Sequence, residues 1–232
     1  MDYRKEYEKW LASPALSEDE RAELRALEGN DKEIKARFYG PLEFGTAGLR
    51  GTMYTGLHNM NRHVIRWATQ GFANVIRAEG TEAMQKGIAV CMDCRNHSAE
   101  FARETACVMA ANGIHVRLFE SLRPTPELSF AVREYGCQAG VNVTASHNPK
   151  EYNGYKVYWA DGAQLPPQHA AAIADELTRI DIFTGVRSMD YEQALAEGRI
   201  ELLGEDCDRR FMANVMLSLI HISEPTRLAL IS

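Results

Sequence analysis

The sequence predicts a mixed-sheet α/β/α domain preceded by a helical extension. Two short apolar runs, 88–92 and 114–119, have the form of strands buried on both faces of a sheet, and the segment between them is patterned as a helix. Two strands joined in this way are most economically parallel, with a right-handed crossover. Residues 154–159 instead alternate in polarity and run into a hairpin turn, so we expect strands of both directions.

The first forty residues are expected to form helices outside this domain. Ser17 and Glu20 have the spacing of a capping box, in which each residue satisfies a backbone N–H of the other. Gly29 then fits the end of a helix. A glycine-rich stretch, FGTAGLRG at 44–51, separates this extension from the next helix.

The first half of the domain follows in order. Asn61 is expected to cap a helix whose apolar residues keep close to the 3.6-residue period, and Gly80 lies just past its end. After the strand at 88–92, we expect Ser98 to cap a second helix and Gly113 to follow its last turn. The strand at 114–119 completes this unit.

The second half begins with Thr125 and Pro126, which are typical of a cap followed by a proline at the first helical position. A short strand is expected around Val141 and Val143, and the alternating strand 154–159 turns at Asp161-Gly162. A helix that starts with proline and a shorter one near 191–197 close the pattern.

Composition limits the possible partners and location. The 232 residues carry a formal charge of −6, which argues against a nucleic-acid partner, because such binding needs clustered Lys and Arg. No run of about 18 apolar residues is present, and the first ten residues lack the apolar centre of a signal peptide. We therefore expect no membrane association and a cytoplasmic location.

The cysteines do not form a disulfide or zinc pattern. Their number is odd, and the C-x-x-C pair lies in a strand-like run with no second pair to complete a zinc tetrahedron. We expect reduced structural thiols at all five positions: Cys91, Cys94, Cys107, Cys137 and Cys207.

The stretch TASHNPKEYNGYK, which starts at Thr144, carries the chemistry. A buried strand ends near Thr144, so Ser146 lies on a loop at the sheet edge where ligands bind in open α/β sheets. Asn148 precedes a proline and is pushed out of helical geometry, while Asn153-Gly154 can take positive φ. The backbone N–H groups of such an irregular loop can face a bound anion.

Two other interpretations of this loop are possible. It could be a turn in which Ser146 and Asn148 only satisfy backbone groups. It could also belong to a serine hydrolase, but the G-x-S-x-G elbow is absent, and His147, as the adjacent residue, is poorly placed to be the base of a catalytic triad.

TASHNPKEYNGYK resembles the phosphoserine loop of the α-D-phosphohexomutases. FGTAGLRG and the Pro-Thr-Pro at 124–126 occur in the order expected for that family, and the form of FGTAGLRG is most similar to the phosphoglucomutase/phosphopentomutase branch. The resemblance covers roughly residues 41–203, which correspond to the first domain of the family. It implies a serine that gives a phosphoryl group to a sugar monophosphate and takes the other phosphate back from the resulting bisphosphate.

The resemblance also implies roles for individual residues. Ser146 would be the phosphoserine, and its phosphate would also ligate Mg²⁺. Lys156 and His147 would act as general acid and base near the sugar hydroxyl, with Arg50 and Asn148 at the phosphate. Sugar 1,6-bisphosphate would be the activator and intermediate. From the residues alone, Arg50 could equally be a solvated charge, Lys156 an outward strand residue and His147 a loop-stabilising partner.

Asp93 and Arg95 follow the strand at 88–92 and are further candidates. At a sheet edge they could orient the serine loop or simply pair with each other, and Arg95 is also a candidate phosphate ligand. The remaining histidines show no metal-binding spacing: His58, His63, His97, His115 and His169.

The sequence departs from the family pattern in one respect. The family takes its other metal ligands from a D-x-D-x-D loop in a second domain, and no such run occurs here; the acidic stretch at 205–208 is not that pattern. We therefore expect a fragment that is inactive alone. The expected parts are a helical extension at 1–40, the phosphoserine domain at 41–205, the start of a second domain at 206–216, and a non-native tail at 217–232.

The expected tail rests on a resemblance of its own. LSLIHISEPTR, which begins at Leu217, resembles a translated transposase adapter used in sequencing libraries. Two functions therefore remain open: the catalytic domain of a Mg²⁺-dependent sugar-phosphate mutase, and a noncatalytic phosphosugar-binding or regulatory domain. The preferred sugar and the oligomeric state do not follow from the sequence.

Overall fold

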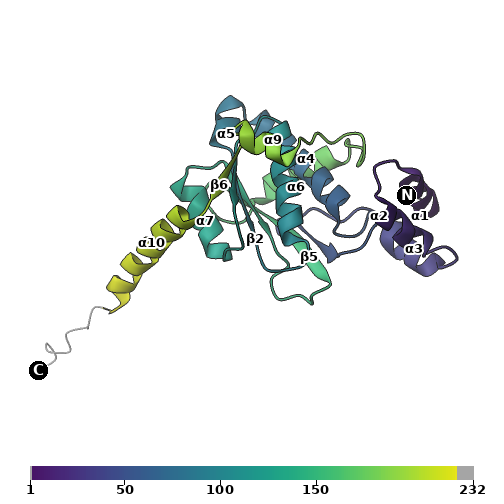
Figure 1. Cartoon of the computed structure of the whole chain (residues 1–232), viewed down its shortest axis with the longest axis horizontal. Helices are drawn as coiled ribbons and strands as arrows, with labels where there is room; N and C mark the ends of the chain where they lie inside the picture. The colour runs from purple at the N-terminus through teal and green to yellow at the C-terminus, as the bar shows by residue number, and fades with distance from the viewer. Residues whose placement is uncertain (1, 224–232) are drawn as a thin grey trace, which may run out of the picture.

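The computed structural model describes residues 2–223 and contains, within them, a six-stranded sheet of order β1-β5-β4-β2-β3-β6 (Figure 1). β2 pairs in parallel with β3 and β4, and β3 pairs in parallel with β6. β5 runs antiparallel to both of its neighbours, β4 and β1. The expectation of a mixed sheet is confirmed. The strands are β1 Leu49–Thr52, β2 Ile88–Met92, β3 Val116–Phe119, β4 Ala139–Val143, β5 Tyr152–Trp159 and β6 Ile200–Leu203.

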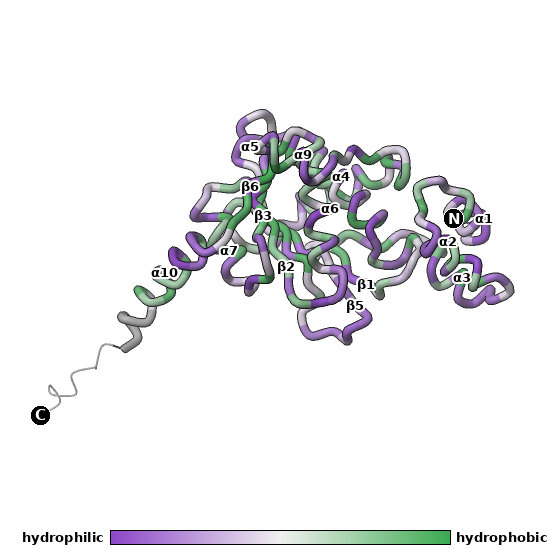
Figure 2. The backbone as a smooth tube through the Cα atoms, in the orientation of Figure 1, coloured by the Kyte–Doolittle hydropathy of each residue, from purple (hydrophilic) through white to green (hydrophobic). Residues whose placement is uncertain are grey.

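Helices cover both faces of the sheet, and the apolar residues of the strands lie between them (Figure 2). Alternate residues of β2 divide between two cores. Val90 packs in the larger core with α4 and α6, and Cys91 packs in the smaller core against α7. The helices of the domain are α4 Arg62–Ala78, α5 Thr81–Lys86, α6 Ser98–Ala111, α7 Thr125–Glu134, α8 Pro167–Leu177 and α9 Tyr191–Ala196.

The helical extension is also confirmed, as α1 Tyr3–Ala12, α2 Glu18–Arg25 and α3 Asp31–Phe38. The predicted capping box at Ser17 and Glu20 is complete. Trp10 is fully buried and makes edge contacts with Phe38, His63 and Phe183, which belong to three different segments. These aromatic contacts fix the extension to the domain.

Several local expectations need correction. Ser98 is the first residue of α6 and not its cap; His97, at φ 61°, is the cap, and the Ser98 hydroxyl donates to Asp93 instead. Likewise, α7 begins at Thr125, with Pro124 as its cap and Pro126 in its first turn. The strands β1 and β6 were not expected. Each has only four residues, β1 contains a glycine, and β6 does not alternate polar and apolar residues, so neither gives a strong strand signal.

Two other local expectations are confirmed, the cap of α4 and the turn after β5. Asn61 caps α4 through its side chain, and β5 turns back at Asp161-Gly162 to bridge Gln164. The five cysteines are free thiols, of which only Cys94 is exposed. None of the helices within residues 2–223 combines the length and apolarity needed to cross a bilayer.

α10, Glu205–Ser223, projects from the domain (Figure 1) and is joined to α7 by a charged cluster. The Arg123 guanidinium donates to both Asp208 oxygens at 2.6 and 2.8 Å. Glu127, whose side chain is 4% exposed, has its Oε1 4.0 Å from Arg123 Nε, and this oxygen accepts no hydrogen bond from the described residues. Most of the expected adapter tail lies outside the described residues; the part up to Ser223 belongs to α10.

We expect Glu127→Gln to stabilise the protein above neutral pH. Burial and the neighbouring Asp208 raise the pKa of the Glu127 carboxyl from 4.5 to about 7. The folded protein thus holds a proton that the unfolded chain releases, and the contribution of Glu127 to stability falls as the pH rises from 4.5 to about 7. Glutamine avoids this loss, so urea unfolding at pH 8 should show a gain of roughly 1–2 kcal/mol.

At pH 5 the two proteins should differ little, because Glu127 is then mostly protonated. Glu120→Gln is the matched control: this carboxylate also faces Arg123, at 3.7 Å, but is 49% exposed, so its replacement should change the stability by less than about 1 kcal/mol. An equal gain at both pH values would contradict the prediction.

Candidate functional site

Ser146 lies at the carboxyl edge of the parallel strands, on the serine loop, which comprises residues 144–152, from the end of β4 to the first residue of β5. It is exposed and has φ 57°, a left-handed conformation that costs an L-residue about 1 kcal/mol or more. The positive φ expected at Asn153-Gly154 is wrong, because these residues belong to β5. The strained residue of the loop is the serine itself.

The loop is held by short hydrogen bonds of its own. The Ser146 N–H donates to the Thr144 hydroxyl at 3.0 Å, and the Asn148 N–H donates to the Ala145 carbonyl at 3.1 Å. Gly154 packs closely on the first residue of the loop: a Cβ at this position would lie 2.5 Å from the Thr144 carbonyl oxygen. A glycine is therefore required here by space and not by φ.

Lys156 and Arg50 lie on one face of the sheet beside this loop. Arg50 pairs with Gly154 in the antiparallel register, two residues from Lys156, so both side chains project to the same side. Arg50 also donates to the Asn148 side-chain oxygen at 2.9 Å. Burial lowers the pKa of the Lys156 ammonium, and the positive charge of Arg50 lowers it further, against the opposing effect of Asp93.

His147 and Ser146 are close but weakly connected. The Ser146 hydroxyl lies 3.4 Å from the His147 Nδ1, and both side chains are exposed. This distance is at the outer limit of a hydrogen bond. A catalytic triad would need a third group to orient the imidazole, and no carboxylate contact to His147 occurs among residues 2–223.

Arg95 is nearly buried, and its guanidinium faces the inside of the serine loop. Nη2 donates to the carbonyls of Ser146 and Asn148, both at 2.7 Å. Nη1 donates to the carbonyls of Pro149 at 2.9 Å and Tyr152 at 3.0 Å. Nε lies 3.4 Å from a carboxylate oxygen of Asp93, so every side of the guanidinium is engaged.

Two asparagines that were not among the candidate site residues complete the arrangement. The Asn153 amide donates to Ser98 Oγ and to the Asn96 carbonyl, both at 3.0 Å, and thereby ties β5 to the loop after β2. Asn142 is buried opposite Lys156 in the register of β4 and β5, and its amide donates to the Thr125 hydroxyl at 2.8 Å. For Asn142 the available signal was its position in an expected buried strand, because an amide there must find partners. Asn153 was expected outside the strand at 154–159 and gave no such signal.

An open cavity of about 410 Å³ lies between the loop after β2 and the serine loop. It brings together Ser146, Asn148 and Arg95 from the predicted set. Arg50, Lys156 and His147 do not line it. Its lining residues are Asp93, Cys94, Arg95, Asn96, Ser146, Asn148 and Lys150.

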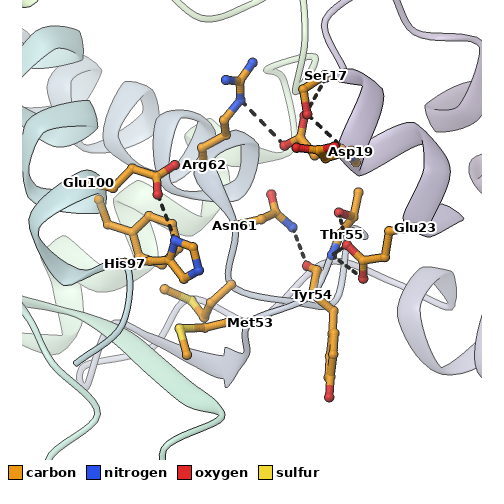
Figure 3. A pocket seen from close by; sticks show the side chains of 13 residues that line it. Ser17, Asp19, Glu23, Met53, Tyr54, Thr55, Asn61, Arg62, His97 and Glu100 are labelled. Carbon is orange, nitrogen blue, oxygen red and sulfur yellow. Dashed lines mark hydrogen bonds and ion pairs between the residues drawn. The ribbon is translucent and has the colours of Figure 1, made fainter.

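A second cavity, of about 320 Å³, lies between the helical extension and the starts of α4 and α6 (Figure 3). Its polar groups bind one another: Asn61 donates to the Tyr54 carbonyl, Thr55 donates to Glu23, and His97 contacts Glu100. These internal contacts show that the cavity is part of the junction with the extension.

The described residues do not by themselves form a magnesium site. They contain no cluster of three or more His, Cys, Asp or Glu side chains arranged to hold a metal ion. Mg²⁺ prefers six oxygen ligands in a nearly octahedral arrangement, and a phosphate on Ser146 would supply one of them.

The fold and the loop define an α/β/α domain that presents a serine at the ligand-binding edge of its sheet. The family model for the α/β/α domain I of phosphoglucomutase/phosphomannomutase matches residues 41–182. The chain belongs to this family.

Its relatives include several phosphomutases. It is 42% identical to the Homo sapiens phosphopentomutase, over 65% of this chain and 26% of the relative. It is 35% identical to the Saccharomyces cerevisiae phosphoribomutase, over 82% of this chain and 31% of the relative. A solved phosphoglucomutase (parafusin) from Paramecium shares the fold, with a TM-score of 0.53 and 22% identity over 67% of this chain and 28% of that one. The chain thus spans about a quarter to a third of the length of these proteins.

Proposed function

We propose that this chain is the phosphoserine domain of a sugar-phosphate mutase that interconverts hexose 1- and 6-phosphates, or pentose 1- and 5-phosphates. The observation that carries the proposal is Ser146, exposed in a strained conformation at the carboxyl edge of the sheet, with Lys156 and Arg50 on the adjoining face. Strained residues concentrate at functional sites. The names of the relatives support the phosphomutase class.

In the proposed reaction, phosphorylated Ser146 transfers its phosphoryl group to a hydroxyl of a sugar monophosphate. The bond between phosphorus and Ser146 Oγ breaks as the bond to the sugar oxygen forms. The hydroxyl proton passes to Lys156 or His147, and a proton from this pair goes to the leaving Ser146 Oγ, so that a serine hydroxyl forms. The lowered pKa of Lys156 favours this role, because it increases the fraction of neutral amine. The bisphosphate then reorients and returns its other phosphate to Ser146.

Cationic groups would stabilise the transfer. Its transition state is loose and highly charged, so positioning and positive charge supply most of the catalysis. Arg50 offers a planar fork that suits phosphate oxygens, and its contact with Asn148 places both beside the loop.

Magnesium and the remaining substrate contacts would come from outside the described residues. We propose that this chain does not complete the cycle alone, since it spans a fraction of its relatives' length and forms no metal site within residues 2–223. The proposed cofactors are Mg²⁺ and a sugar 1,6-bisphosphate.

The test compares the full-length protein with this chain. With Mg²⁺ and a trace of sugar 1,6-bisphosphate, the full-length protein should convert the sugar 1-phosphate, and peptide mass spectrometry should find the phosphate on Ser146. This chain alone should show no turnover. If the full-length protein binds the sugar phosphate without ever carrying phosphate on Ser146, the alternative of a noncatalytic phosphosugar-binding domain is correct.

A further inference from the structure

We infer that Arg95 is a positioning residue that holds the serine loop in shape, and that it does not bind the transferred phosphate. The inference rests on the proposed function, because it concerns how Ser146 is presented for phosphoryl transfer. Arg95 was a candidate phosphate ligand on sequence grounds, and its contacts in the structure favour a different role.

The donor count of the guanidinium is the first argument. An arginine has five N–H groups in a fixed plane. Four of these N–H groups are directed at the carbonyls of the serine loop, at 2.7–3.0 Å, and the fifth faces Asp93. A phosphate oxygen could gain an N–H from Arg95 only if a loop carbonyl lost one.

The anchoring of Arg95 is the second argument. One Asp93 oxygen accepts from the Arg95 backbone N–H at 3.0 Å and from the Ser98 hydroxyl at 2.8 Å, while the other oxygen faces Nε. Ser98 is fully buried and also accepts from Asn153 of β5. The guanidinium is therefore fixed from behind by β2, α6 and β5, and its position is set before any ligand binds.

The effect on Ser146 follows from the geometry. The Arg95 guanidinium donates hydrogen bonds to the carbonyl of Ser146 itself and to those of Asn148, Pro149 and Tyr152. Because the left-handed conformation of Ser146 is unfavourable by itself, external contacts must stabilise it. A guanidinium that donates to carbonyls on both sides of the turn provides such contacts. It does not contact the Ser146 hydroxyl, and Ser146 lines the open cavity.

Arg95→Lys separates a positioning role from a charge role. It keeps the positive charge, but its ammonium is a single point with three donors and cannot span four carbonyls. If Arg95 positions the loop, Arg95→Lys should lose phosphoryl uptake from a sugar 1,6-bisphosphate nearly as strongly as Arg95→Ala, by roughly a hundred-fold. If Arg95 instead acts on the phosphate through its charge, Arg95→Lys should retain most of the phosphoryl-uptake rate of the parent protein.

Hydrogen exchange of the full-length protein provides a readout that does not depend on activity. The amides of Asn148 and Tyr152, which are bonded within the loop, should exchange roughly ten-fold faster in Arg95→Lys, while those of β2 and β3 keep their protection. Arg50→Lys is the matched comparison, since Arg50 contacts the loop only at Asn148 and should leave the exchange of the Tyr152 amide unchanged.

A second, more conservative variant covers the case in which Arg95→Lys does not fold. Asp93→Asn keeps the shape of the anchor and removes its charge, so it should raise the exchange of the same two amides by a smaller factor. Unchanged loop exchange in both variants, or near-parental phosphoryl uptake by Arg95→Lys, would overturn the inference. If the parent protein takes up no phosphate at all, the proposed function fails, and the exchange data still decide whether Arg95 holds the loop.

Discussion

Replacing Ser146 with alanine is expected to abolish phosphoryl uptake from a sugar 1,6-bisphosphate by the full-length protein, by about a thousand-fold or more. The substitution removes the proposed acceptor oxygen and little else, because the hydroxyl makes only a 3.4 Å contact with His147. The loop should persist, since its carbonyls remain bonded to Arg95. Uptake is measured as radiolabel retained on the purified protein.

Ser146→Gly adds a test of the strain. Glycine takes positive φ without the steric cost that serine carries at φ 57°, so this variant should be as inactive as Ser146→Ala but more stable than it, by about 1 kcal/mol in urea unfolding. The control is Ser188→Ala, at an exposed serine far along the chain, which should retain full uptake. Stoichiometric label on Ser146→Ala would mean that another residue accepts the phosphate.

Gly48→Ala is expected to destabilise the protein by about 4 kcal/mol or more. Gly48 has φ +75°, and a Cβ there would lie 1.8 Å from the carbonyl oxygen of Tyr155, which belongs to β5. The backbone carbonyl of Tyr155 cannot move aside as a flexible side chain can, so the start of β1 would have to separate from β5 at this point. Arg50, two residues further along β1, would move with it.

Gly45→Ala is the matched control, because Gly45 lies in the same glycine-rich stretch, has no positive φ, and no atom lies within 4 Å of its added Cβ. Urea unfolding of the two variants should therefore differ widely, with Gly45→Ala within about 1 kcal/mol of the parent protein. Similar stability of the two variants would show that the contact between Gly48 and Tyr155 is not needed.

Elements with a strong local pattern were predictable from the sequence. β2 and α4 were expected with nearly correct bounds, because a continuous apolar run and a sustained 3.6-residue period are difficult to satisfy in other ways. β1 and β6 were not, since each is a four-residue strand that exists through pairing with a partner distant in sequence. Helix starts were misplaced by one residue where the side chain of Ser98 or Thr125 had a tertiary partner.

The residues of the candidate site could be proposed from the sequence, but their contacts could not be predicted. Ser146, Lys156 and Arg50 stand out through their loop and strand positions and through the family resemblance. The engagement of Arg95 with four carbonyls depends on the conformation of a loop more than fifty residues away, which no local pattern specifies. The positive φ was expected at Asn153-Gly154 because of the preferences of these residue types. It is Ser146 that has the positive φ, and tertiary contacts stabilise this conformation.

The antiparallel pairing of β4 with β5 has a consequence for biosynthesis. The serine loop joins two strands that are adjacent both in the chain and in the sheet, and the distant side chains that contact it, Arg50 and Arg95, both precede it in the sequence. A ribosome therefore delivers these two side chains before the loop itself emerges. The contacts of Arg50 and Arg95 with the loop of Ser146 can therefore form while downstream segments are still being translated, before β6 and α10 are complete.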